Sequence, residues 1–163
     1  LCPDPYFKDI NTIVQSISKT IKKFSFPFSI NSNQPIAISS VDLEKVTNVI
    51  NDSESETGLI INIGFMGTVN KLEIRNIETG ENFIIDYEFM KNDKLIINCN
   101  RGKKSVILTR EAVEYNLIPQ VRSESTFFQL GIGDNRFSFL ADDGEKDMLV
   151  DISFKYYRVY LGV

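Results

Sequence analysis

The last part of the chain decides the fold, and residues 127–163 read FFQLGIGDNRFSFLADDGEKDMLVDISFKYYRVYLGV. Apolar and polar side chains alternate from residue 148 onward, which predicts a long strand with one buried face. The expected buried face carries Met148, Val150, Ile152, Phe154, Tyr156 and Tyr160, and the other face carries Asp151, Ser153, Lys155 and Tyr157. Upstream of this strand, residues 131–135 predict a turn that leads into a second strand, with Phe137 and Phe139 inward.

Short alternating runs also follow one another between residues 59 and 108, with turns expected at residues 79–82, 91–94 and 100–103. Gly80 is free to take the positive φ that its turn requires. Such a meander is typical of a β-sandwich or a barrel, and the C-terminal core strand favours an all-β, antiparallel β-sandwich. The side chains expected to face the shared core are Leu72, Ile74, Phe83, Ile85, Phe137, Phe139, Val150, Ile152 and Phe154.

Two segments follow this pattern poorly. In residues 1–25, apolar residues recur at spacings of three and four, as in an amphipathic helix, yet the many Ile, Val, Thr and Ser residues favour a strand. We divide the chain into an arm, residues 1–25, and a sandwich domain, residues 26–163. Because the first residue is Leu1, we expect the arm to link the sandwich to a domain upstream.

In residues 110–126, we expect Ala112, Val113, Leu117 and Ile118 to cover one end of the sandwich in a helical turn or a loop.

The composition argues against several classes of function. The 163 residues carry a net charge of −4, which argues against binding to nucleic acid or to anionic membranes. The chain contains no apolar run of the ~20 residues that a membrane helix needs. It also contains no His and no Trp. The absence of His excludes the usual hydrolase triads, and the absence of Trp removes the best stacking platform for sugars. Cys99 is expected to be a buried free thiol, and nothing in the sequence calls for the alternative, a bridge to Cys2.

No motif identifies a chemical site. The acidic residues 142–147 lack the order of a calcium loop, and the glycines at 131 and 133 fit a turn better than a phosphate loop. A pair of catalytic carboxylates has no distinguishing pattern. Tyr157 is either an interface anchor or an ordinary strand residue. We therefore assign no catalytic, cofactor-binding or metal-binding residue, expect no cofactor, and expect that the protein is not an enzyme.

Several segments, in the same order and spacing, resemble the siphophage distal tail protein family. They are residues 128–139, 150–157 and 160–163, residues 69–83, 92–97 and 101–103, and, near the start, residues 2–7 and 24–28. Residues 2–7 are similar to the junction at which the ring-forming N-terminal domain of that family meets its C-terminal domain, and residues 24–28 are similar to the next landmark of the family.

The resemblance implies a galectin-like, jelly-roll type β-sandwich in a structural component of a phage or prophage tail tip. It implies contacts with the tail tube, the tail-tip protein and adsorption proteins, and a hexameric ring of the full-length protein. We expect this chain alone to be monomeric, with assembly in the host bacterial cytoplasm and a final location at the virion tail tip. The alternative is a carbohydrate-binding module that assists host adsorption. The missing His and Trp argue against that alternative, so we expect no binding to simple β-galactosides or common cell-wall sugars.

Overall fold

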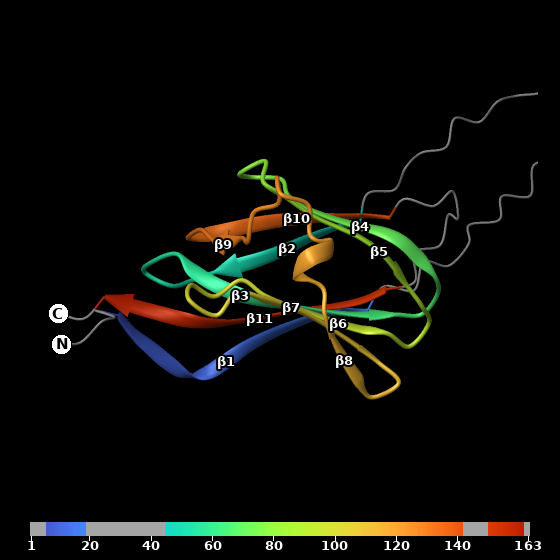
Figure 1. The fold of residues 1–163 in the computed structure, drawn as a ribbon. Coiled ribbons are helices and arrows are strands. Elements are labelled where there is room, and N and C mark those ends of the chain that lie inside the picture. Colours follow the sequence, from blue (N-terminus) through green and yellow to red (C-terminus); the bar gives the residue numbers. More distant parts are fainter. Residues whose placement is uncertain (1–5, 19–44, 142–149, 162–163) are drawn as a thin grey trace, which may run out of the picture.

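A computed structural model describes residues 6–18, 45–141 and 150–161 of the chain. These residues form eleven strands and one short 3-10 helix, arranged as two antiparallel sheets that face each other (Figure 1). The structure thus confirms the all-β, antiparallel sandwich that the alternating sequence predicts.

The two sheets differ in width. The larger sheet has the order β1 (Tyr6–Ser18), β11 (Val150–Leu161), β3 (Thr57–Phe65), β6 (Lys94–Asn98), β7 (Ser105–Arg110) and β8 (Val113–Asn116), and β9 (Gln129–Leu130) also pairs with β3. The smaller sheet has the order β2 (Lys45–Asn51), β10 (Gly133–Ala141), β4 (Val69–Asn76) and β5 (Asn82–Phe89). The 3-10 helix η1 (Ile118–Gln120) follows β8.

The core lies between the sheets. All nine side chains that were expected to share it are buried, with at most 5% of any of them exposed. Phe137 of the smaller sheet stacks on Phe154 of the larger sheet, with 5.4 Å between their ring centroids. Phe128, which precedes β9, packs edge-on against Phe137 at 5.3 Å. The strict alternation of buried and half-buried residues along β3 shows how the pleat directs one face of each strand into this core.

The segment with the ambiguous periodicity is a strand. Residues 6–18 form β1, which pairs with β11 from the Tyr6–Leu161 pair to the Ser18–Asp151 pair, with a register shift between Lys8 and Thr12. The β-branched composition of this segment therefore outweighs its helical spacing. Residues 6–18 of the expected arm are thus hydrogen-bonded to the edge of the larger sheet. Residues 19–44 lie outside the described residues.

Two further expectations need correction. Tyr160 is 39% exposed rather than buried, whereas the neighbouring Val159 is only 4% exposed. The buried face of β11 therefore shifts by one residue beyond its last pair with β3, Tyr156–Leu59. In the segment of residues 110–126, only Leu117 is buried, whereas Ala112, Val113 and Ile118 are exposed. The expected helical turn does exist as η1. It is preceded by β8, which pairs with β7 and forms the edge of the larger sheet. Met148 lies outside the described residues.

Candidate functional site

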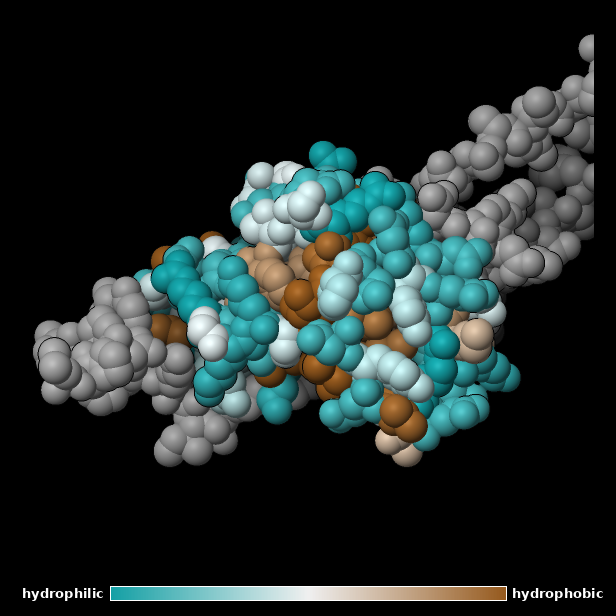
Figure 2. Space-filling model, in the orientation of Figure 1, coloured by the Kyte–Doolittle hydropathy of each residue, from teal (hydrophilic) through white to brown (hydrophobic). Residues whose placement is uncertain are grey.

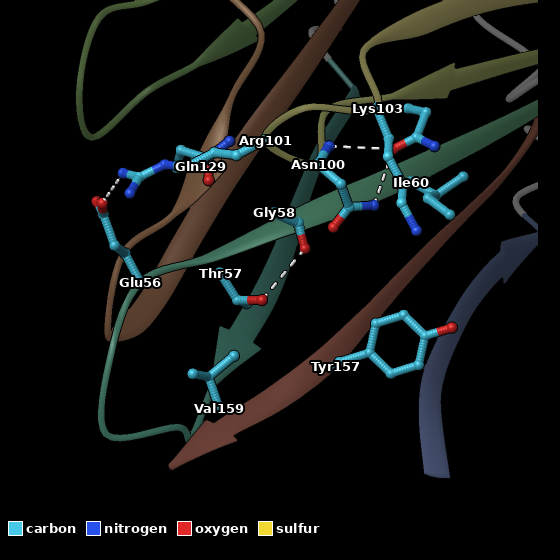
Figure 3. A pocket seen from close by; sticks show the side chains of 11 residues that line it. Glu56, Thr57, Gly58, Ile60, Asn100, Arg101, Lys103, Gln129, Tyr157 and Val159 are labelled. Carbon is cyan, nitrogen blue, oxygen red and sulfur yellow. Dashed lines mark hydrogen bonds and ion pairs between the residues drawn. The ribbon is translucent and has the colours of Figure 1, made fainter. Parts of the chain in front are cut away.

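A pocket of about 510 Å³ opens on the outer face of the larger sheet (Figure 3). It lies where β3 changes its neighbour, because β3 pairs with β6 from Ile60 onward but with β9 at Thr57 and Gly58. The turn between β6 and β7, residues 99–104, folds over the sheet at this point. The lining residues are Glu56, Thr57, Gly58, Ile60, Asn98, Asn100, Arg101, Lys103, Gln129, Tyr157 and Val159.

Gly58 lets this turn approach the sheet closely. A Cβ atom at Gly58 would lie 2.7 Å from both the Cα and the side-chain oxygen of Asn100. Contacts this short do not occur between real atoms, so any larger residue at this position would push the turn away from β3. The shape of the pocket therefore depends on the missing side chain of Gly58.

Three side-chain amides in the pocket are held in fixed orientations. Asn98 Oδ1 accepts hydrogen bonds from the backbone N–H of Asn100 at 3.0 Å and from its Nδ2 at 2.8 Å. Gln129 Nε2 donates to the carbonyl oxygens of Cys99 and Phe128, each at 2.8 Å. Within the described part of the chain, the other polar atom of each amide has no hydrogen-bond partner, namely Asn98 Nδ2, Asn100 Oδ1 and Gln129 Oε1. The pocket thus offers one positioned donor and two positioned acceptors.

Charged and aromatic side chains complete the lining. Arg101 forms an ion pair with Glu56 at the rim, where 73% and 51% of the two side chains are exposed. An ion pair this exposed contributes about 0–1 kcal/mol to stability, so it has little structural value. Figure 3 shows Lys103 and Asn100 on the turn, with Tyr157 across the opening on β11. Ile60 and Val159 supply the aliphatic part of the lining.

The two adjacent tyrosines of β11 have different environments, as the alternation predicts. Tyr156 is 2% exposed, and its hydroxyl donates to the carbonyl oxygen of Ile50 at 2.5 Å. Burial, with a further contribution from the Asp52 charge, raises the pKa of Tyr156. Tyr157 is half-buried and lines the pocket. The alternating sequence indicates Tyr157 as an outward-facing aromatic residue, but it does not indicate the three amides. Asn98 and Asn100 carry a weak signal, since one faces outward on a strand and the other starts an expected turn, whereas Gln129 carries none.

The opposite end of β6 holds a second polar cluster. Asp93 is 2% exposed, and its carboxylate accepts from Arg110 Nε at 2.9 Å, from Arg110 Nη2 at 2.5 Å and from the Met90 N–H at 2.8 Å. The Arg110 guanidinium lies 5.6 Å from the centre of the Tyr87 ring. Burial acts to raise the pKa of Asp93, but the hydrogen bonds from Arg110 and Met90 and the Arg110 charge outweigh it, so the pKa is lowered. Every part of this carboxylate is used within the fold.

The other candidate sites have structural roles or lie outside the described residues. Asn135 binds both the N–H and the carbonyl of Gly131, each at 2.9 Å, so the glycine-rich segment is a closed turn. Cys99 is a free, buried thiol, and burial raises its pKa to about 12. Cys2 and the acidic residues 142–147 are outside the described residues. In the described ranges, no group of three potential metal ligands occurs, and no helix has the length and apolarity to cross a membrane.

An apolar edge is exposed beside β8. All four residues of β8, the last strand of the larger sheet, are exposed, so the described residues of the smaller sheet cover neither face of this strand. Val113 and Tyr115 on β8 are 51% and 43% exposed, and Ile118 on η1 is 40% exposed. Figure 2 shows hydrophobic residues toward the centre and the lower part of this face, where Figure 1 places η1 and β8, among mostly hydrophilic neighbours. An edge strand of this kind presents unpaired backbone groups beside apolar side chains.

A family model matches residues 52–157, well over half of the chain, and its description is siphovirus-type tail component, C-terminal domain. The chain belongs to this family. The match covers both polar clusters of this tail-component domain and its strands from β3 to most of β11. No curated protein sequence matches the domain.

Solved structures show where the same fold occurs. The crystal structure of phage SPP1 Dit (gp 19.1), described as a paradigm of hub adsorption apparatus in phages infecting Gram-positive bacteria, is similar with a TM-score of 0.64 and 12% identity. That similarity covers 98% of this chain and 51% of the SPP1 protein. The phage P2 baseplate, in its activated conformation with Ca, contains a chain with a TM-score of 0.50 and 14% identity, covering 94% of this chain and 53% of that one. The tail-component domain thus spans about half the length of these solved chains.

Proposed function

We propose that this chain is the C-terminal domain of a distal tail protein and that it acts as a structural hub at the tip of a phage or prophage tail. The observation that carries the proposal is the family match over residues 52–157, together with the shared fold in a hub protein and in a baseplate chain. The domain would present surfaces to neighbouring tail proteins during host attachment. The proposed neighbours are the tail tube, the tail-tip protein and adsorption proteins.

The surface of the domain supports a role in protein contacts. β8 is an exposed edge strand with apolar side chains at Val113 and Tyr115, and an added strand from a neighbour would satisfy its free backbone groups. By contrast, the buried polar groups described above are occupied by structural hydrogen bonds, as at Asp93 and Asn135. A contact role therefore suits this domain better than catalysis, and we propose that it has no enzymatic activity.

We further propose that the full-length protein forms a hexameric ring whose main contacts lie outside this chain. A ring needs two complementary surfaces on each subunit, and the solved relatives are about twice as long as this chain. Sedimentation equilibrium at about tens of micromolar should give a monomer for this chain and a hexamer for the full-length protein. A stable hexamer of this chain alone would place the ring contacts within these residues instead.

Immunogold labelling of virions tests the location. Antibodies against this domain should label the tip of the tail, because the proposed protein is assembled into the tail in the bacterial cytoplasm and stays in the virion. Antibodies against a major capsid protein provide the matched control. Labelling along the tail tube or on the capsid, with the tip unlabelled, would contradict the proposed role.

A further inference from the structure

The pocket on the outer face of the larger sheet remains unexplained by a role in protein contacts. Three of its lining residues each carry a polar atom without a hydrogen-bond partner within the described fold, namely Asn98 Nδ2, Asn100 Oδ1 and Gln129 Oε1. The cavity volume of about 510 Å³ falls within the range of small-molecule sites, which is about 300–1,000 Å³. From these features we infer that the pocket is a binding site for a neutral saccharide.

The chemistry of the lining matches a sugar ring. A saccharide combines apolar C–H faces with a rim of hydroxyl groups, and each hydroxyl can donate and accept a hydrogen bond. The Tyr157 ring and Ile60, both half-buried, offer apolar surface to a C–H face, and the buried Val159 lies behind them in the lining. The Asn98 amide offers a donor, while the Asn100 and Gln129 amides offer acceptors. Both kinds of contact therefore meet in one cavity.

The amides are also positioned before any ligand arrives. Asn98 and Asn100 hold each other through a 2.8 Å hydrogen bond, and Gln129 is held by two backbone carbonyls. Fixed polar groups lose little rotamer freedom when they bind, which favours affinity for a small ligand. Gly58 maintains the close approach between the turn and β3 that sets this arrangement. The site is thus built from the backbone as well as from side chains.

The charges of the pocket argue against an anionic ligand. Arg101 and Glu56 neutralise each other at the rim, which leaves Lys103 as the single lining cation without an opposite charge in the described part of the chain. A phosphate-rich ligand is usually bound by several Arg or Lys residues. The apolar contribution from three residues is also too small for a purely hydrophobic ligand. A neutral, hydroxyl-rich molecule fits the lining best.

This inference differs from what the sequence suggests. The absence of Trp and His argued against sugar binding, but the structure places Tyr157 and three amides where those residue types would act. The inference does not depend on the proposed hub role, because it uses only the pocket. A hub domain without sugar affinity and a sugar-binding domain outside a hub are separate experimental outcomes.

Titration of the isotopically labelled chain with defined saccharides tests the site by NMR. The four saccharide probes are galactose, lactose, maltotriose and chitotriose, each up to about 10 mM, a range that detects millimolar dissociation constants, and glycerol phosphate is titrated in parallel as the anionic comparison. We expect saturable amide shifts at residues 58, 100, 129 and 157 with at least one probe. The absence of shifts at these residues with all four probes would overturn the inference. Binding limited to glycerol phosphate and lost at about 0.5 M salt would also overturn it, since that behaviour indicates an anion site.

Paired variants separate the pocket from the fold. Tyr157→Leu and Asn100→Ala should each weaken saccharide binding about tenfold. The first removes the aromatic contact with the sugar, and the second removes one hydrogen bond to it. Their controls are Tyr115→Leu on exposed β8 and Asn62→Ala, whose amide bonds Ser153 Oγ on the same sheet outside the pocket lining. Neither control should change the dissociation constant. Equal effects of a control and its matched pocket variant would contradict the assignment.

Discussion

The two turns at the ends of β6 both carry short polar side chains, but these side chains differ in how fully they are hydrogen-bonded within the fold. The turn before β6 buries Asp93, whose carboxylate is fully engaged by Arg110 and by the Met90 N–H. The turn after β6 carries Asn100, which is fixed by Asn98 yet leaves its side-chain oxygen at an open pocket. The first turn connects β5 of the smaller sheet to β6 of the larger sheet, whereas the second connects the paired strands β6 and β7. Both turns contain a residue with positive φ, Asn92 in the first and Gly102 in the second.

The difference shows how to tell a structural polar cluster from a candidate binding site. Each hydrogen bond of Asp93 is made inside the fold, so its loss would leave a buried group unsatisfied and cost stability. The amides of the second turn use one polar atom for the fold and keep the other accessible. Changes in the first turn should therefore act on stability, and changes in the second should act on binding.

The largest effect on the free energy of unfolding should come from a change in the core. It provides the reference against which the effects at the two turns are compared. Phe154 is fully buried and stacks on Phe137. Phe154→Ala should lower the free energy of unfolding by about 3–5 kcal/mol, the usual range for a buried Phe. Urea titration followed by circular dichroism would measure it, since the chain has no Trp to report. A loss below about 1 kcal/mol would place Phe154 outside the core and contradict the register of β11.

A smaller but clear effect is expected at the first turn. Asp93→Ala should lower the free energy of unfolding by about 2–3 kcal/mol, because it removes a buried carboxylate and leaves Arg110, only 23% exposed, without its partner. The same urea titration applies. Glu56→Ala, which removes the ion-pair partner of Arg101 in the second turn, is the matched control. Because both side chains of this pair are well exposed, the change should alter the free energy of unfolding by less than about 0.5 kcal/mol.

The first turn should also make stability depend on acidity. The pKa of Asp93 is lower in the fold than in the unfolded chain, so the folded state binds a proton less readily. Its stabilising contribution is therefore complete above the ordinary carboxyl pKa of about 4 and is lost as the pH falls below that value. Urea titrations of the wild type and Asp93→Asn between pH 7 and about pH 3 should converge as the pH falls. Parallel curves would indicate that Asp93 does not contribute.

A third effect concerns the backbone of the second turn. Gly102 has a φ of 73°, which side chains with a branched Cβ adopt poorly. Gly102→Val should cost about 1–2 kcal/mol, whereas Gly102→Asn should cost less than about 0.5 kcal/mol, as Asn tolerates this conformation. Asn92, with a φ of 72°, shows that the first turn already uses Asn in this way. Thermal unfolding of the two Gly102 variants would rank them, and equal melting temperatures would argue against strain at this position.

The smallest effect on stability should come from the pocket itself. Asn100→Ala should lower the free energy of unfolding by less than about 1 kcal/mol, since it removes one half-buried side-chain hydrogen bond to Asn98. Urea titration measures this change alongside Asp93→Ala. A loss at Asn100 as large as the loss at Asp93 would mean that the two turns do not differ as the structure indicates.

Alternation of side chains predicted the core because burial follows directly from the pleat of a strand. Phe137, Phe139 and Phe154 could therefore be placed from sequence, and so could the outward direction of Tyr157. The pairing of strands could not, because it joins residues far apart in the chain. Gln129 reaches the pocket only because β9 replaces β6 beside β3 at Gly58, and no local pattern encodes that exchange.

The strand assignment of residues 6–18 illustrates a second limit. Its spacing fits a helix, and its composition fits a strand, so local information was balanced. Backbone pairing with β11 decided the matter, since an edge of the larger sheet was available to this segment. Tyr160 shows the reverse case. The alternation of side chains in the sequence continues to this residue, but the buried face of the strand no longer follows it.

The antiparallel pairing of β1 with β11 also has a mechanical consequence. Tyr6 lies opposite Leu161, and Figure 1 shows the two strand ends at the same side of the molecule. A force that separates Tyr6 from Leu161 would break the hydrogen bonds between β1 and β11 one pair after another, starting at this end of the ladder. A pull between Ser18 and Leu161 would instead load the whole ladder at once, in shear. The force that this edge withstands thus depends on the direction of the load, and a tail that strains the domain along the ladder would meet its stiffer response.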